Sequence, residues 1–402
     1  MCREYKKERA TVHLKELVGG ALSFYAAAAV AKTGGVHIFV AEDRDAAAYL
    51  LNDFYNLLDE KQVYFFPSSY KRSAAYGAED AQGVVQRTAA MNAVRGFTKG
   101  YLVVCTYPEA LAERVVDAAT LQRDTIAVKL GDKISIAVLE DALADANFTR
   151  VDFVYEPGQY SVRGGIVDVF SYSESKPYRI DFFGDEVDSI RRFNISSQLS
   201  ADKLDRVEII PNLNAGEAPR VSFVQFAGSS AACWFYDADY VLRRVNDLRR
   251  KVLADMENPG QIDRLLTSRN VLLRDMAGNS VVALRDNLPE RPATAAVVFD
   301  TAPQPKFNKN FEMLADDMIR NSLRGYATYI LSENKVQVER LENIFHQIGR
   351  GQAAVRSLSV TLHEGFVDND LKLCLYTDHQ IFDRYQRYRI NGEIRRDEQM
   401  TV

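Results

Sequence analysis

Segments that favour β-strands alternate with segments that favour helices along most of this chain, and one dense β region interrupts them. Apolar runs at 36–43, 62–67 and 101–107 are separated by helical segments at 44–58 and 83–96. Strands that alternate with helices indicate a parallel sheet covered by helices on both faces. We therefore expect the chain to fold around a parallel α/β domain.

Between residues 125 and 202 the pattern changes to short strands divided by turn signals. A short helix at 136–148 comes first, and the turns are marked by Pro157-Gly158, Gly164-Gly165 and Gly184-Asp185. Such dipeptides are typical of tight turns between antiparallel strands. We expect residues 125–202 to form a mainly antiparallel β module, inserted into an α/β domain that comprises 1–124 and 203–292.

A third segment of α/β character covers residues 293–386. Pro303 and Pro305 mark its beginning, helices are expected at 310–325 and 334–348, and strands at 326–332 and 371–378. Residues 387–402 are rich in charge and lack a helical apolar stripe, so we expect a linker there. The chain thus contains a discontinuous α/β domain, an inserted module, a smaller α/β domain and a linker.

The composition excludes several classes of protein. The net charge of −5 argues against a general nucleic-acid binder, and the apolar stretch 18–31 is too short to span a bilayer. No secretory signal is visible, so we expect a cytoplasmic protein without membrane contact. The histidines and cysteines lack the spacing of a metal site or a disulfide framework. The cysteines are therefore expected to be reduced thiols; they are Cys2, Cys105, Cys233 and Cys374.

The stretch "ELVGGALSFY" has the outline of a phosphate-binding loop but lacks its chemistry. Such a loop reads Gly-x-x-x-x-Gly-Lys-Ser/Thr, because bare backbone amides, a lysine and a hydroxyl bind the phosphates and Mg²⁺. Counted from Gly19, these last three positions hold Phe24, Tyr25 and Ala26. We predict a degenerate loop that binds no nucleotide, whose glycines let a helix begin close to a sheet. A nucleotide site of an unrecognised kind is the alternative.

Two further features favour ordinary structural roles. The basic run 242–251 follows a helical apolar stripe, so a solvated helix face is favoured over contacts with DNA phosphates. The only tryptophan, Trp234, lies in an aromatic cluster that is favoured as a core strand over a ligand cage.

The strand expected at 178–183 places polar and apolar side chains on opposite faces. Alternation puts Arg179, Asp181 and Phe183 on one face, opposite an apolar set. An exposed aromatic side chain beside arginine is a composition enriched at protein interfaces. The alternative is that Phe183 packs under a neighbouring loop and Arg179 only pairs with Asp181. The apolar set consists of Tyr178, Ile180 and Phe182.

The segments "PGQYSVRGGIVDVF" and "PYRIDFFGDEVDSIRRFN" together closely resemble the second domain of UvrB and of the transcription-repair coupling factors, the Mfd family. The stretch "ELVGGALSF" stands where UvrB has its phosphate loop. The segment "LHEGFVDNDLKLCLYTDHQIF" resembles the end of the third domain of the coupling factors, which UvrB lacks. The resemblance covers nearly the whole chain and implies a degenerate helicase-like domain, an inserted UvrA-binding module and a small third domain.

This resemblance implies a non-catalytic scaffold that recruits UvrA to stalled RNA polymerase during transcription-coupled nucleotide excision repair. It places Arg163, Arg179 and Phe183 on the surface that contacts UvrA, and Asp181 lies on the same strand face. No cofactor is expected in this part of the family. ATP, Mg²⁺, DNA and RNA polymerase are expected to bind modules that follow residue 402. The sequence leaves open whether the C-terminal domain among them masks the UvrA-binding face.

Departures from UvrB support this interpretation. The nearest candidate for the acidic motif of an ATPase is "FYDADY", which has Asp237 but places Ala238 where the water-activating glutamate is required. The segment 65–82, which corresponds to the DNA-clamping hairpin of UvrB, is short and poor in aromatic residues. An active UvrB-like helicase or ATPase with a divergent nucleotide site remains the alternative function.

Overall fold

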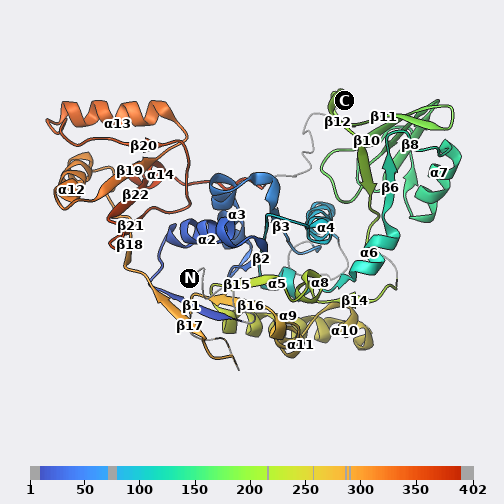
Figure 1. The fold of residues 1–402 in the computed structure, drawn as a ribbon, viewed down its shortest axis with the longest axis horizontal. Coiled ribbons are helices and arrows are strands. Elements are labelled where there is room, and N and C mark those ends of the chain that lie inside the picture. Colours follow the sequence, from blue (N-terminus) through green and yellow to red (C-terminus); the bar gives the residue numbers. More distant parts are fainter. Residues whose placement is uncertain are drawn as a thin grey trace.

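A computed structural model describes residues 10–70, 79–214, 217–256, 258–285, 288 and 291–390. Three parts lie side by side, with the third α/β domain and the inserted β module at opposite ends of a central α/β domain (Figure 1). Cys2 and most of the expected linker, residues 391–402, lie outside the described residues. None of the described helices has the length and apolar content needed to cross a bilayer.

The central domain contains a seven-stranded sheet in which all paired strands are parallel. This confirms the parallel α/β architecture expected from the alternation of strands and helices. In spatial order the strands are β17 (Ala295–Val298), β1 (Thr11–Lys15), β16 (Ser280–Ala283), β15 (Ala232–Phe235), β2 (Gly35–Val40), β4 (Tyr101–Thr106) and β3 (Val63–Phe65).

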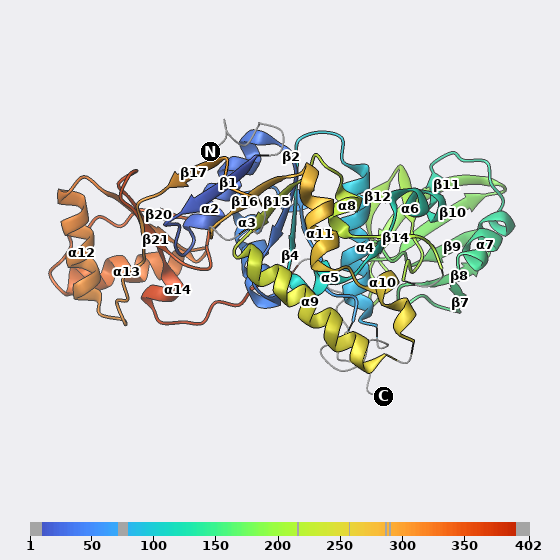
Figure 2. The same cartoon turned by 90° about the horizontal axis from the view of Figure 1, so that it is seen from below.

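Helices cover both faces of this sheet, as the long apolar strands require. Figures 1 and 2 show α2 (Ala21–Thr33), α3 (Arg44–Leu57) and α4 (Ala81–Gly96) on one face, and α9 (Ala238–Asp255) and α11 (Arg269–Asp275) on the other. Shorter elements connect them: α5 (Pro108–Ala112), β5 (Val115–Val116), α6 (Ala118–Asp124), β14 (Arg220–Val221), α8 (Phe223–Ala227) and α10 (Ile262–Leu265).

Trp234 and the basic run 242–251, for which the sequence favours structural roles, both lie in the central domain. Trp234 is 2% exposed, and its indole N–H donates to Nδ1 of His37 over 3.1 Å. Burial lowers the pKa of His37 to about 4, which keeps this core imidazole neutral. On α9 the stripe of Val241, Leu242 and Val245 is buried, and arginines on the basic run pair with neighbouring carboxylates.

The inserted module is built on a six-stranded sheet with the order β12-β11-β10-β9-β8-β7. Neighbours from β8 to β12 are antiparallel, and β7 joins β8 in parallel. Helix α7 (Ile136–Asp145) packs on one face, which contains the module's core. The strands are β7 (Thr149–Arg150), β8 (Gln159–Arg163), β9 (Ile166–Val169), β10 (Tyr178–Phe183), β11 (Glu186–Phe193) and β12 (Ser200–Leu204).

The core of this module continues past residue 202. Strand β13 (Arg206–Ile209) pairs with β6 (Ile126–Lys129), and Val207 and Ile209 are buried in the same apolar cluster as Ile180. The antiparallel pairing of β6 and β13 brings the two ends of the insertion together, as a module inserted into another domain requires.

The third domain has a five-stranded mixed sheet with the order β18-β21-β22-β19-β20. Strand β17, which the sequence analysis groups with this domain, pairs instead with β1 of the central sheet, so the chain changes sheet between residues 298 and 301. The elements are β18 (Thr301–Pro303), α12 (Phe311–Leu323), β19 (Ala327–Leu331), α13 (Lys335–Gln347), β20 (Ser357–Leu358), β21 (Phe366–Asp368), β22 (Leu373–Thr377) and α14 (Asp378–Ile381).

Candidate partner-docking surface

The outer face of the β8–β11 sheet, opposite α7, carries the site residues predicted from the sequence. On β10, Tyr178 and Ile180 are buried and Phe182 packs against the module's core, whereas Arg179, Asp181 and Phe183 point outward. Arg163 lies on the neighbouring part of this face at the end of β8. The period of two thus orients the strand as the sequence predicts.

Asp168 on β9 binds both arginines, and sequence analysis did not select it. Its side chain is 2% exposed, and it lies directly opposite Arg179 in the β9–β10 register. Arg179 donates from Nε and Nη2 to the two carboxylate oxygens over 2.7 and 2.8 Å, and Arg163 donates from Nη2 to one of them. The hydrogen bonds to Asp168 are the largest cause of the raised pKa of Arg179.

Each of the two guanidinium groups also lies over an aromatic ring. Arg179 is centred 4.3 Å from the ring of Phe193, which is 1% exposed, and Arg163 is centred 4.8 Å from the half-exposed ring of Phe153. The Arg179 side chain is only 15% exposed, compared with 36% for Arg163. Two positive groups are therefore held in fixed positions on the surface, and Arg163 is the more accessible.

Asp181 and Phe183 differ in their availability to a partner. The carboxylate of Asp181 accepts hydrogen bonds from Ser189 and Arg191, so the pairing with Arg179 considered from the sequence is not observed. Phe183 is 84% exposed at the end of β10, which excludes packing under a neighbouring loop. Phe183 is thus more exposed to a partner than Phe153, the other exposed phenylalanine of this face, whereas Asp181 is held by hydrogen bonds within the sheet.

Sequence analysis missed three contributors to this surface: Asp168, Phe153 and Phe193. Asp168 had a detectable signal, because it is the single acidic residue in the apolar strand "GGIVDVF" and shares a strand face with Ile166. The two aromatic residues had none, since their contacts with arginine depend on how distant segments pack.

The degenerate phosphate loop connects β1 to α2, the position that a functional loop would occupy. A Cβ on Gly20 would lie 2.2 Å from the carbonyl oxygen of Glu364, so the space beside this glycine is occupied by the third domain. Phe24 and Tyr25 also contact that domain, through Phe366 and Asp368. The side chains that replace the glycine and lysine of a phosphate loop are therefore engaged in an interdomain contact.

The candidate acidic motif has a structural role as well. Asp237 caps α9 by accepting a hydrogen bond from the backbone N–H of Tyr240 over 2.9 Å, and it lies 3.5 Å from the guanidinium of Arg285. The side chain of Ala238 is fully buried. Among the described residues, no group of histidine, cysteine, aspartate and glutamate side chains has the arrangement of a metal site.

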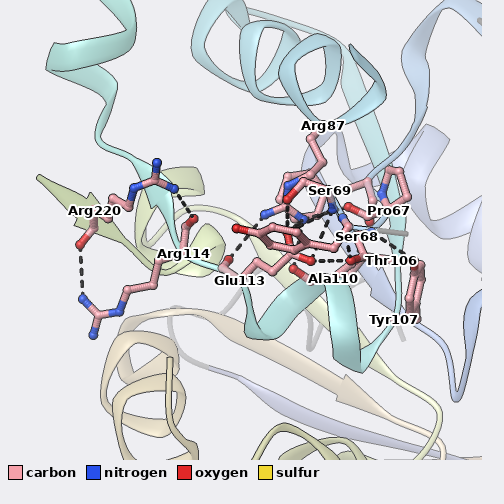
Figure 3. Close-up of polar contacts among 12 residues, drawn as sticks. Pro67, Ser68, Ser69, Arg87, Thr106, Tyr107, Ala110, Glu113, Arg114 and Arg220 are labelled. Atoms are coloured by element: carbon pink, nitrogen blue, oxygen red, sulfur yellow. Dashed lines mark hydrogen bonds and ion pairs between the residues drawn. The ribbon is translucent and has the colours of Figure 1, made fainter. Parts of the chain in front are cut away.

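A second buried polar cluster lies where β3 and β4 end (Figure 3). Glu113 accepts hydrogen bonds from the backbone N–H and the hydroxyl of Ser69 over 3.0 and 2.6 Å. Arg87 donates to the carbonyls of Pro67 and Ala110 and lies 3.5 Å from Glu113. These groups satisfy one another and fix the segment that enters the expected hairpin, whose residues 71–78 lie outside the described part of the chain.

Comparisons with known proteins identify a family match in the inserted module and relatives that match up to about half of the chain. Residues 126–214 match the model of the UvrB interaction domain family. The transcription-repair-coupling factors of Bacillus subtilis strain 168 and Escherichia coli K12 are each 27% identical over 199 residues, which is 49% of this chain and 17% of the relative. That of Haemophilus influenzae is 35% identical over 101 residues, 25% of this chain and 9% of the relative. The resemblance predicted from the sequence is confirmed over about half of this chain, not over nearly all of it, and the match spans less than a fifth of the length of these relatives.

Proposed function

We propose that this chain is the N-terminal part of a transcription-repair coupling factor and that it recruits UvrA in transcription-coupled nucleotide excision repair. The observation that carries the proposal is that the family match and the exposed face belong to the same module. The residues matched by the UvrB interaction domain family, 126–214, fold into the module whose outer face presents Phe183 and the two arginines held by Asp168.

The geometry of this face suits a protein partner. An aromatic side chain that is 84% exposed gains apolar burial only when another surface covers it. Arg163 and Arg179 are already oriented by Asp168 and by aromatic rings, so little side-chain entropy is lost when they bind. We infer a partner surface with an apolar pocket for Phe183 and acidic groups near Arg163.

We infer that the chain acts as a scaffold and not as an active UvrB-like ATPase. Positions 24 and 25 hold aromatic side chains that contact the third domain, and position 238 holds a buried alanine. These observations support a role without a bound cofactor. In this proposal ATP, Mg²⁺, DNA and RNA polymerase bind other modules of the coupling factor, which acts in the cytoplasm.

The affinity of purified UvrA for the chain tests the proposal. Phe183→Ala should weaken binding by roughly 30- to 1000-fold, the effect of removing a residue that contributes about 2–4 kcal/mol at an interface. Leu323→Ala is the matched control, because Leu323 is an apolar side chain that is 85% exposed in the third domain. A parent chain that fails to bind UvrA would contradict the proposed function. A folded Phe183→Ala variant with parental affinity would contradict the docking face.

A further inference from the structure

The third domain makes a close backbone contact with the former phosphate loop. The N–H of Gly20, at the N-terminus of α2, donates to the carbonyl oxygen of Glu364 over 3.1 Å. A Cβ on Gly20 would lie 2.2 Å from that oxygen, and one on Gly19 would lie 2.8 Å from the carbonyl oxygen of Gly365 and 3.4 Å from Oε2 of Glu364. Only glycines at these two positions allow the third domain to approach this closely.

Helix α3 contributes a second set of contacts to the same segment. The carboxylate of Asp53, which is 2% exposed, accepts hydrogen bonds from the backbone N–H of His363 and from the hydroxyl of Ser23, each over 2.6 Å. The ring of Tyr49 stacks on the imidazole of His363, with 3.7 Å between the ring centres. Asp53 thus joins α2, α3 and the third domain through one buried group.

The aromatic residues of the degenerate loop complete the contact. Phe24 lies 5.7 Å from Phe366 between ring centres, and the hydroxyl of Tyr25 donates to Asp368. A shared buried apolar cluster contains Ala21 from α2 and Leu331, Leu362, Phe366 and Leu375 from the third domain. Two of the three residues that abolish the phosphate-loop pattern, Phe24 and Tyr25, are therefore residues that bind the third domain.

We propose that the third domain fills the former phosphate loop permanently, and that the carbonyl oxygen of Glu364 takes the place at the N-terminus of α2 where a phosphate would bind. Free backbone N–H groups and the positive end of the helix dipole make this position favourable for an acceptor or an anion. The contact closes the loop to nucleotides and fixes the third domain to the central domain. It does not depend on the proposed docking of UvrA.

Spin labels placed on the two domains measure whether the contact fixes them. Lys32→Cys on α2 and Leu323→Cys on the third domain provide exposed attachment sites, and pulsed electron paramagnetic resonance gives their distance distribution. We expect one narrow distribution in the parent chain. Gly20→Ala should broaden it, because the added methyl group collides with Glu364. Gly96→Ala is the matched control, since a Cβ there meets no atom within 4 Å, and its distribution should stay narrow.

Leu362→Ser tests the same contact from the third domain, where Leu362 is 1% exposed in the shared cluster. It should also broaden the distribution while the circular dichroism spectrum stays that of the parent, and it decides the question if Gly20→Ala fails to fold. Narrow distributions in the folded variants would overturn the proposal. Equal broadening by Gly96→Ala would overturn it as well, because the effect would not be specific to the contact.

Discussion

Replacing Asp168 by asparagine should destabilise the inserted module by removing the negative charge that two arginines share. Arg179 makes two hydrogen bonds to this carboxylate with a side chain that is 15% exposed. Arg163 makes one hydrogen bond with a side chain that is 36% exposed. Asparagine keeps the shape of Asp168 but is neutral and has one acceptor oxygen. Arg179 therefore loses one of its two hydrogen bonds and the attraction of the negative charge.

The expected coupling energies follow from these contacts. A hydrogen bond to a charged group contributes about 1.5–3 kcal/mol, so the two bonds of the shielded Arg179 should couple it to Asp168 by about 2–3 kcal/mol. The more exposed pair with Arg163 should contribute about 0.5–1 kcal/mol. Arg179 should therefore matter more for stability, and Phe183 and Arg163 for contact with a partner.

A double-mutant cycle measures both couplings. Asp168→Asn is combined with Arg179→Met and separately with Arg163→Met, since methionine keeps an apolar stem without the charge. Hydrogen exchange of peptides that cover β8–β10 reports the opening free energy of this module without interference from the other domains. Equal couplings, or a larger coupling for Arg163, would refute the assignment of Arg179 as the residue that Asp168 mainly stabilises.

Two further predictions concern the former phosphate loop and its neighbours. Burial raises the pKa of Asp53 to about 7 from 3.8, so the folded chain binds this proton more tightly than the unfolded chain, and stability should fall as the pH rises from about 4 through 7. Asp53→Asn should remove up to about 4 kcal/mol of this pH dependence, and parallel Tm-against-pH curves for parent and variant would contradict the prediction. Calorimetry with millimolar Mg-ATP should show no saturable heat, because Tyr25 donates to Asp368 and provides no cation for phosphate. A stoichiometric site of micromolar affinity would contradict the scaffold function.

Local sequence patterns predicted the elements of the fold but not every pairing between them. The runs that form β17 and β18 lie close together, within nine residues that end at Pro303. Nothing in their composition shows that β17 pairs with β1, which is about 280 residues away, while β18 pairs with β21. Periodicity reports the type of an element and the face that it buries, whereas its sheet depends on contacts between distant segments.

For the candidate docking surface, the sequence likewise predicted the orientation of a strand but not the contacts between strands. The period of two placed Arg179, Asp181 and Phe183 on one face, but it could not identify the partner of Arg179. The β9–β10 register sets Asp168 directly opposite Arg179, whereas Asp181 lies two residues along the same strand. Residues directly opposite across a strand pair are closer, so Asp168 binds the arginine.

For the degenerate loop, the sequence predicted which chemical groups are missing but not which segment lies against it. The residues at positions 24–26 predict that the chemistry of nucleotide binding is missing, and the calorimetry with Mg-ATP tests that prediction. They could not show which group of the chain contacts Gly20, because that segment lies more than 340 residues further along the chain.

Site-specific photo-cross-linking tests most directly whether UvrA binds the face that carries Phe183. A benzophenone amino acid is placed at position 183, and at position 323 in a control variant, since both native side chains are more than 80% exposed. Irradiation with UvrA should cross-link the variant at position 183 and leave the control unlinked. Equal cross-linking at both positions, or none at position 183 while the variant still binds UvrA, would contradict the assignment of this face.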